Sequence, residues 1–197
     1  MTQQVLSSAG AIKESNSFGN AGYGTTLPTS PTDGMEYILV DSVSAPTYQW
    51  RLRYNASSAQ TDKWEFVGGP PATAHVVTRE QINSASYTGL TTAQSITVPR
   101  AGQYQLEFGY TYENPASTQH AYYATIKIGA AAASDTNAAI NTIRSVAGGL
   151  WQSTMSNQYI AACAASDALV MQYRCDSADT ATYAGQRFFK VTPIRVS

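Results

Sequence analysis

The sequence is poor in charged residues, and this scarcity excludes one class of partner. Asp, Glu, Lys and Arg make up 13% of the 197 residues, where about a quarter is usual for soluble domains. The 12 basic residues do not form the basic run or patch that nucleic-acid-binding proteins carry. We therefore expect no nucleic-acid partner. Ser, Thr, Gln and Asn must cover the surface instead, a composition typical of β-rich extracellular or virion proteins.

Long apolar stretches are also missing. No run approaches the roughly 20 residues of a membrane-spanning helix, so we expect no membrane insertion. The opening residues, Met-Thr-Gln-Gln-Val-Leu, lack the basic and apolar regions of a secretory signal peptide. A protein of this kind that works outside a cell is expected to be made in the host cytoplasm and released by lysis, as part of a virion.

Cysteine is scarce. Cys163 and Cys175 do not amount to a disulfide framework. Both lie near a predicted hairpin of residues 158–163 and 168–174, with its turn at residues 165–167. In that register the two thiols do not face each other. We expect two buried or half-buried free thiols, since cysteine is among the residues most often buried.

Chemistry-bearing groups are few and scattered. His75 and His120 fall in different predicted elements, without other ligands at zinc spacing. Neither a Gly-x-Ser-x-Gly elbow nor a phosphate-binding loop occurs. Asp176 and Asp179 are compatible with calcium but are more simply solvated turn residues. A pair of glycosidase carboxylates stays open, because any two acids can meet in space. We expect a non-enzymatic protein with no metal and no cofactor.

The strongest structural signal is a run of alternating residues after the Pro99–Gly102 turn. Five large residues fall on one side: Tyr104, Leu106, Phe108, Tyr110 and Tyr112. Polar residues, including Gln103, Gln105 and Glu107, fall on the other. This period of two predicts a long, half-buried strand over residues 103–113. Its polar face is expected to look to solvent or to a neighbouring subunit.

The remaining pattern predicts an all-β protein. Further strands are predicted at residues 74–78, 86–90, 94–98, 121–128, 142–147, 151–156, 158–163, 168–174 and 187–196. The last of these changes phase at Pro193, which predicts an edge or a bulge there. Residues 130–143 are the one place where a helix fits, with Asp135 as its N-cap. Many short strands between turn-rich loops are typical of a sandwich or barrel.

Composition divides the chain into three parts. Residues 1–26 are rich in Gly, Ser and Asn, so we expect a disordered tail or an extended N-terminal arm that folds on docking to a neighbour. Residues 27–71 predict a small antiparallel β module with strands at 37–40, 50–54 and 64–66. Two prolines, Pro70 and Pro71, end it. Residues 72–197 form the main β domain.

Aromatic side chains are the candidate binding groups. Tyr122, Tyr123, Trp151, Tyr159 and Tyr183 can serve as stacking platforms for sugar rings, or they can belong to the core or to a subunit interface. Trp151 follows Gly148-Gly149, near a predicted turn, and is the first candidate for a surface or interface contact. Tyr122 and Tyr123 are the other two.

Two resemblances follow from particular motifs. The module Leu27-Pro28-x-Ser30-Pro31-x-Asp33-Gly34-Met35-Glu36, then Trp50-Arg51-Leu52-Arg53-Tyr54, then the stretch from Lys63-Trp64 to Pro70-Pro71, resembles a module of tailed-bacteriophage minor tail and tail-fibre proteins. The downstream half is similar to jelly-roll heads of the tumour-necrosis-factor and complement-collagen type. There the Pro99-x-x-Gly102-x-Tyr104 opening of a long strand and an aromatic-rich last strand recur.

These resemblances imply a C-terminal jelly-roll β-sandwich, a homotrimer, display on a virion and recognition of a host-surface glycan or protein. We therefore expect a structural, tail-associated phage protein, with residues 1–26 contacting other virion proteins. The chain shows no long shaft, so a capsid decoration protein or head fibre is the first alternative. A carbohydrate-binding module or glycan hydrolase is the alternative from another class.

Overall fold

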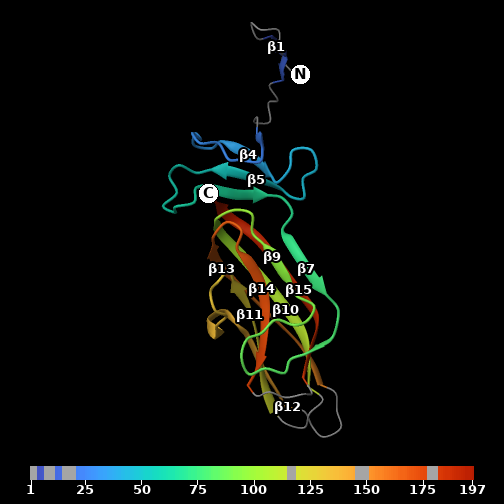
Figure 1. The fold of residues 1–197 in the computed structure, drawn as a ribbon. Coiled ribbons are helices and arrows are strands. Elements are labelled where there is room, and N and C mark those ends of the chain that lie inside the picture. The colour runs from blue at the N-terminus through green and yellow to red at the C-terminus, as the bar shows by residue number, and fades with distance from the viewer. Residues whose placement is uncertain (1–3, 7–11, 15–20, 115–118, 145–150, 177–181) are drawn as a thin grey trace. The chain divides into compact units, whose positions relative to one another are not determined.

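The computed structural model describes residues 4–6, 12–14, 21–114, 119–144, 151–176 and 182–197. Figure 1 shows these residues as strands and connecting loops. The chain divides into two units, residues 1–70 and 71–196. The described residues contain strands and one 3-10 turn, so the predicted all-β class is confirmed. Among them no helix is long and apolar enough to cross a membrane.

The first unit is built around a small sheet. Its strands lie in the order β3 (Gly22–Gly24), β4 (Glu36–Val40), β5 (Gln49–Tyr54) and β6 (Trp64–Gly68). β3 is parallel to β4, and the other pairs are antiparallel. The predicted strands at 37–40, 50–54 and 64–66 are confirmed. β3 was not predicted, because Gly22 and Gly24 carry no side chains that show an alternating pattern.

Residues upstream of this sheet include a second, short pairing. β1 (Gln4–Leu6) lies antiparallel to β2 (Ile12–Glu14). Residues 1–26 were expected to form a disordered tail or an extended arm that folds on docking; the described parts of this segment contain this pair and β3.

The alternation of β5 explains the core of the small unit. Trp50 and Leu52 are buried, whereas Arg51 and Arg53 between them are exposed. Leu39 and Trp64 from the neighbouring strands are buried as well. The Trp50 and Phe66 rings meet edge to face with centroids 6.5 Å apart, an arrangement that aromatic pairs prefer. Four large apolar side chains thus stabilise a sheet that would be marginal as a bare hairpin.

The second unit contains eight longer strands in two sheets, plus the short β8 (Glu80–Gln81). One sheet has the order β13-β10-β15-β7, and the other has the order β12-β11-β14-β9. The strands are β7 (Ala72–Val76), β9 (Ser95–Thr97), β10 (Gly102–Asn114), β11 (Gln119–Ile128), β12 (Ala139–Arg144), β13 (Trp151–Cys163), β14 (Ala168–Cys175) and β15 (Tyr183–Val196).

The pairing of these eight strands is nested. The first pairs with the last (β7 with β15), the second with the seventh (β9 with β14), the third with the sixth (β10 with β13) and the fourth with the fifth (β11 with β12). β10 also pairs with β15, and β11 with β14. Such a long antiparallel pairing, folded into two sheets, is a jelly roll. The predicted jelly-roll β-sandwich is confirmed.

The core lies between the two sheets. Tyr104, Leu106, Phe108, Tyr110 and Tyr112 of β10 are all 0% exposed, as their alternation predicted. Aromatic contacts join the sheets: the Tyr112 ring stacks on Tyr122 of β11, with centroids 4.7 Å apart. The ring of Tyr110 meets Tyr173 of β14 edge to face at 5.3 Å.

The predicted hairpin of residues 158–163 and 168–174 is wrong. β13 pairs with β10, and β14 pairs with β11 and β9, so the turn at 164–167 crosses from one sheet to the other. Each strand was recognised by its alternation, which identifies a buried face but not the partner strand.

Both cysteines are free and buried, as predicted. Burial raises the pKa of the Cys163 thiol to about 11, with the nearby Asp167 carboxylate adding to the effect. The thiol therefore keeps its proton near neutral pH and is a poor nucleophile.

Three other predictions are corrected. The helix expected over residues 130–143 is a single 3-10 turn, Asp135–Asn137, followed by β12. The β-branched Ile140 and Thr142 pair with β11 there, which outweighs the helix preference of the alanines. Residues 86–90 contribute one isolated bridge, Thr88 to Tyr173, and no strand. Residues 151–156 and 158–163 belong to one strand, β13.

β15 contains two irregularities. Tyr104 pairs with Pro193 and Gln103 with Arg195, which leaves Ile194 without a partner in the register. This bulge confirms the predicted change of phase at Pro193. A second irregularity lies opposite Gly109 to Thr111, where Gln186 has a φ of 45°. It directly precedes Arg187, whose side chain is 0% exposed.

Two segments of the chain bind the terminal nitrogens of the buried Arg187 guanidinium. Nη2 donates to Glu80 Oε1 at 2.7 Å, and Nη1 donates to the Thr92 carbonyl at 3.1 Å. Glu80 in turn accepts from the Thr92 N–H at 3.0 Å. Gln94 Nε2 donates to the Arg187 carbonyl and to the Ala74 carbonyl of β7. A buried charge is tolerated only with partners of this kind.

We predict that this ion pair makes the stability depend on pH in the acid range. Burial alone would raise the pKa of Glu80, but hydrogen bonds from Thr92 and the Arg187 charge outweigh it, so the pKa lies below its ordinary 4.5. A lowered folded-state pKa stabilises the fold above pH 4.5, and this contribution is lost as pH falls through the folded value.

Glu80→Gln should therefore cost roughly 3–5 kcal/mol in urea denaturation at pH 7, because it leaves Arg187 buried beside a neutral group. The difference from wild type should narrow at pH 3. Glu36→Gln serves as the control: its ion pair with Arg51 has side chains 29% and 56% exposed and should contribute less than about 1 kcal/mol. A difference at Glu80 that stays constant from pH 7 to pH 3 would contradict the assignment.

Candidate binding hollow

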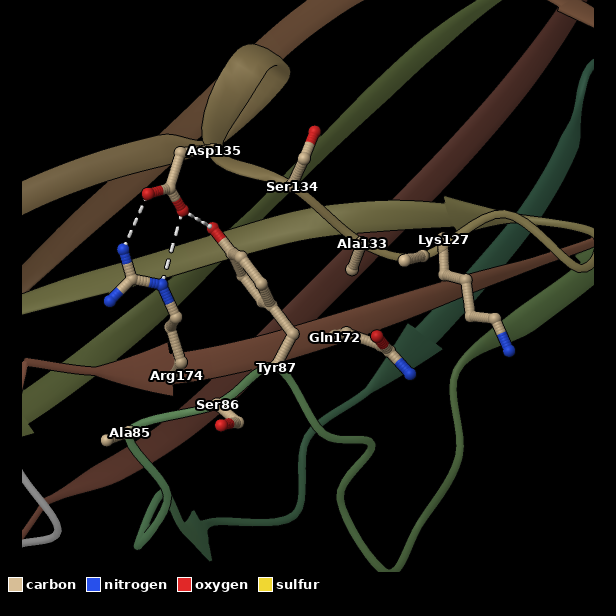
Figure 2. A pocket seen from close by; sticks show the side chains of 10 residues that line it. Ala85, Ser86, Tyr87, Lys127, Ala133, Ser134, Asp135, Gln172 and Arg174 are labelled. Carbon is tan, nitrogen blue, oxygen red and sulfur yellow. Dashed lines mark hydrogen bonds and ion pairs between the residues drawn. The ribbon is translucent and has the colours of Figure 1, made fainter.

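A hollow of about 530 Å³ opens on the outer face of the β11–β14 pair. Its base is formed by outward side chains of β11 and β14, and its walls by residues 85–87 and 132–135. Figure 2 shows the side chains that line it. All of these residues belong to the second unit. The first and the last of them, Ala85 and Arg174, are 89 positions apart along the chain.

Strand alternation determines which side chains reach this face. Tyr122, Ala124 and Ile126 of β11 point into the core, so Tyr123 and Lys127 point outward. On β14 the buried residues are Leu169, Met171, Tyr173 and Cys175, which leaves Gln172 and Arg174 outside. The register places Tyr123 opposite Arg174 and Thr125 opposite Gln172. These side chains therefore form neighbouring rows along the base of the hollow.

At one end of the hollow, Asp135 binds two partners. The Tyr87 hydroxyl donates to Asp135 Oδ1 at 2.7 Å. Arg174 Nη2 donates to Oδ2 at 2.7 Å and its Nε donates to Oδ1 at 3.2 Å, a bidentate contact. The Arg174 guanidinium also lies over the Tyr123 ring, with its carbon 3.5 Å from the centroid. The cluster ties both walls of the hollow to its base.

The cluster has defined protonation states. Hydrogen bonds from Arg174 and Tyr87 lower the pKa of Asp135. Burial, together with the adjacent Asp135 carboxylate, raises the pKa of Tyr87 well above its ordinary value. Near neutral pH the carboxylate is therefore ionised and the phenol protonated. Asp135 is an acceptor in this site and a poor proton donor.

At the other end of the hollow lie polar side chains that are not engaged with other described residues. Lys127 and Gln172 lie on the far side of Tyr87 from Arg174 (Figure 2). Among the described residues, the Lys127 ammonium has no carboxylate partner, and the side chains of Gln172 and Ser86 accept or donate no hydrogen bond. Three alanines, Ala85, Ala132 and Ala133, supply small apolar surfaces between these groups.

The three aromatic residues predicted as surface contacts have different locations. Tyr122 is 0% exposed and stacks on Tyr112 in the core, so its side chain is not a surface contact. Tyr122 lies on the same face of β11 as Ala124 and Ile126, which accounts for its burial. Tyr123 is half-buried beside the hollow, beneath Arg174. Trp151 begins β13 and pairs with Asn114 in the backbone register; its side chain lies outside the described part of the structure.

Two further aromatic candidates are occupied by contacts within the chain. Tyr159 meets Phe108 edge to face at 6.3 Å, and burial raises the pKa of its phenol to about 12. The Arg79 guanidinium covers the Tyr183 ring at 3.5 Å. Each of these two rings therefore has a partner within the chain.

The candidate metal ligands are dispersed. His75 lies exposed on β7, while His120 Nδ1 lies 2.9 Å from Asp176 Oδ1. Asp176 Oδ2 also accepts from the Ala121 N–H, which is a structural contact at the start of β11. Asp179 lies outside the described residues. Within those residues no three His, Cys, Asp or Glu side chains are grouped as metal ligands would be.

Comparisons with known proteins indicate no family. No protein-family model and no curated protein matches the sequence. One similar solved structure is that of Eiger TNF from S. frugiperda: 12% identity over 65% of this chain and 95% of that chain, with a TM-score of 0.45. Another is exo-β-1,3-galactanase from Phanerochaete chrysosporium with galactose: 9% identity over 72% of this chain and 33% of that chain, with a TM-score of 0.28. At these values neither likeness indicates a function.

Sequence reasoning missed the residues that line the hollow. Lys127, Gln172 and Arg174 did show the outward phase of their strands, which was a usable signal. Asp135 was interpreted as a helix cap, and Tyr87 as part of a strand. Their approach to Arg174 depends on how the two loops fold back, and short-range patterns do not show that.

We predict that Asp135→Ala loosens the wall of the hollow without unfolding the jelly roll. The Asp135 side chain is 53% exposed, so the loss of its ion pair with Arg174 should change the unfolding free energy by about 1 kcal/mol or less. Hydrogen exchange at the Ala138 N–H, which donates to the Asp135 carbonyl, should accelerate.

Tyr87→Phe is the matched control, because it removes one hydrogen bond to Asp135 and keeps both the ring and the Arg174 pair. It should accelerate exchange less than Asp135→Ala does. Unchanged exchange at Ala138 in Asp135→Ala would show that this cluster does not brace the wall.

Proposed function

We propose that this chain is a non-enzymatic structural protein of a bacteriophage virion, displayed as a trimer and associated with the tail as a fibre or minor tail protein. The jelly roll is the exposed head and recognises a host-surface glycan or protein. Residues 1–26 contact other virion proteins. The low charge of the chain and the phage-like motif in residues 27–71 support this proposal.

The observation that carries the trimer is the outer face of the β13–β10–β15 sheet. One ion pair lies on this face: Lys190 Nζ lies 2.9 Å from Glu107 Oε2. Its amides and hydroxyls also pair across strands, Gln105 with Gln158 and Thr111 with Thr154, each at 3.3 Å. Because these groups already satisfy one another, a neighbouring subunit can cover them without leaving an unpaired charge in the contact.

Ile160 adds an apolar group to this face. It lies opposite Gln105 in the register and is 63% exposed. An exposed isoleucine surrounded by paired polar groups is consistent with a contact that is completed by a second copy of the chain.

The hollow supports a binding role over a catalytic one. Asp135 is the one carboxylate among its lining residues, and Arg174 holds it ionised. Glycoside hydrolysis ordinarily uses two carboxyl groups, one of which must carry a proton. A glycan hydrolase is therefore the weaker alternative for this site.

We predict that Ile160→Asp dissociates the trimer. A carboxylate placed in a subunit contact must be desolvated without a partner, which weakens association. Light scattering coupled to size-exclusion chromatography should give three times the chain mass for wild type and a lower mass for the variant. Ile140→Asp is the matched control: Ile140 is 52% exposed on the outer face of the other sheet, and its substitution should leave the mass unchanged.

A wild-type protein that stays monomeric at high concentration would contradict the trimer. If Ile140→Asp dissociates the protein and Ile160→Asp does not, the trimer uses the other sheet instead.

The place on the particle is tested separately. Immunogold electron microscopy, with antibody against the jelly-roll unit, should label the tails of particles made by the phage that encodes this chain. Label over the capsid would support a decoration protein or head fibre in its place. Particles that carry no label, in a lysate that contains the protein, would overturn the virion assignment.

A further inference from the structure

We propose that the hollow between residues 85–87 and 132–135 binds an acidic sugar residue of a surface polysaccharide. Lys127 pairs with the sugar carboxylate, and Gln172 and Ser86 hydrogen-bond its hydroxyl groups. This inference rests on the proposed function, since it names the chemical class of the host-surface ligand and the residues that recognise it.

Charge selects an anionic ligand with a single negative group. Three charged side chains line the hollow: Lys127, Asp135 and Arg174. Asp135 and Arg174 neutralise each other through their bidentate contact. Lys127 remains as the uncompensated cation among the lining residues. One ammonium matches one carboxylate, whereas phosphate groups are usually held by several cations or by an arginine fork.

The neutral groups of the hollow match a sugar. The Gln172 amide offers two N–H donors and a carbonyl acceptor, and the Ser86 hydroxyl can donate and accept. Neither side chain is engaged with another described residue. Sugar hydroxyl groups donate and accept in the same way, so both can be satisfied by neighbouring hydroxyls of one ring. The methyl groups of Ala132 and Ala133 provide contact surface for the carbon–hydrogen side of the ring.

The site is held in shape before a ligand arrives. Asp135 fixes the 132–135 wall to Arg174 of β14, and Tyr87 fixes the opposite wall to Asp135. Arg174 in turn rests on Tyr123 of β11. A site whose walls are already braced avoids part of the ordering cost of binding.

The openness of the hollow favours a polymer over a free small molecule. Pockets for free small ligands usually bury most of the ligand surface, whereas this hollow is open to solvent. A repeating polysaccharide can lie across it with one residue seated and the chain continuing on both sides. Binding at one site is then weak, and several copies of the site on an oligomer can raise the avidity by about 10²–10⁴.

Binding to immobilised polysaccharides tests the proposal. The probes are polygalacturonate, alginate, hyaluronate and polysialic acid, which carry carboxylates, with dextran as the neutral polymer. We expect wild type to bind at least one acidic polymer, not to bind dextran, and to lose at least tenfold in affinity with Lys127→Gln. Lys63→Gln is the matched control: it removes one lysine charge from the other unit and should change nothing.

Three results would overturn the site: binding to none of the acidic polymers, equal losses in Lys127→Gln and Lys63→Gln, or dextran binding as strong as acidic binding. Gln172→Ala separates sugar recognition from charge alone, since it should lower acidic-polymer binding while leaving the net charge unchanged. Circular dichroism of each variant confirms that the fold is retained.

The mass of the same samples distinguishes failure of this site from failure of the proposed trimer. Lys127-dependent binding by a monomeric wild type would uphold the site and reject the trimer. A trimer without acidic-polymer binding would reject the site and leave the trimer standing.

Discussion

The jelly roll must provide partners for one buried charge, the guanidinium of Arg187, and this requirement constrains the segments around it. The Arg187 guanidinium on β15 is enclosed, and an enclosed cation costs several kcal/mol unless partners surround it. Those partners come from β8 and from the segment before β9, which contribute little apolar burial besides Ile82. The chain between these two points carries Ser86 and Tyr87. The buried charge thus binds both ends of this segment, and backbone hydrogen bonds of Ser84 with Cys175 and of Thr88 with Tyr173 hold the wall of the hollow against β14.

The interior of the sandwich could be predicted from the sequence because strand alternation is a local property. The five large residues of β10 lie in the core where their phase placed them, and the bulge after Pro193 lies where the phase changes. The strand with which each strand pairs could not be predicted in this way. β13 and β14 follow each other closely, yet they pair in different sheets, because the nested topology assigns each an earlier strand. No short-range pattern encodes that assignment.

The candidate site shows the same division between local and long-range information. Tyr122 and Tyr123 are neighbours with opposite orientations, and the small or apolar residues that share the face of Tyr122 already indicated its inward phase. The outward phase of Lys127 and Arg174 was equally readable. What could not be predicted was that the loops carrying Tyr87 and Asp135 fold back to place these two residues beside Arg174. These contacts join residues 48 and 39 positions apart, through loops whose own composition is unremarkable.

The nested pairing has a consequence for how the chain folds. The first strand of the jelly roll, β7, pairs with the last, β15, and β10 also needs β15 as its neighbour. The β13-β10-β15-β7 sheet therefore remains incomplete until β15 has been made. Folds dominated by such distant pairings close slowly, because the entropy of long loops is lost before most contacts form. Until then β10 exposes an unpaired edge beside five large apolar side chains, a surface open to wrong partners. The same chain geometry that gives a closed sandwich delays its protection until β15 has been made.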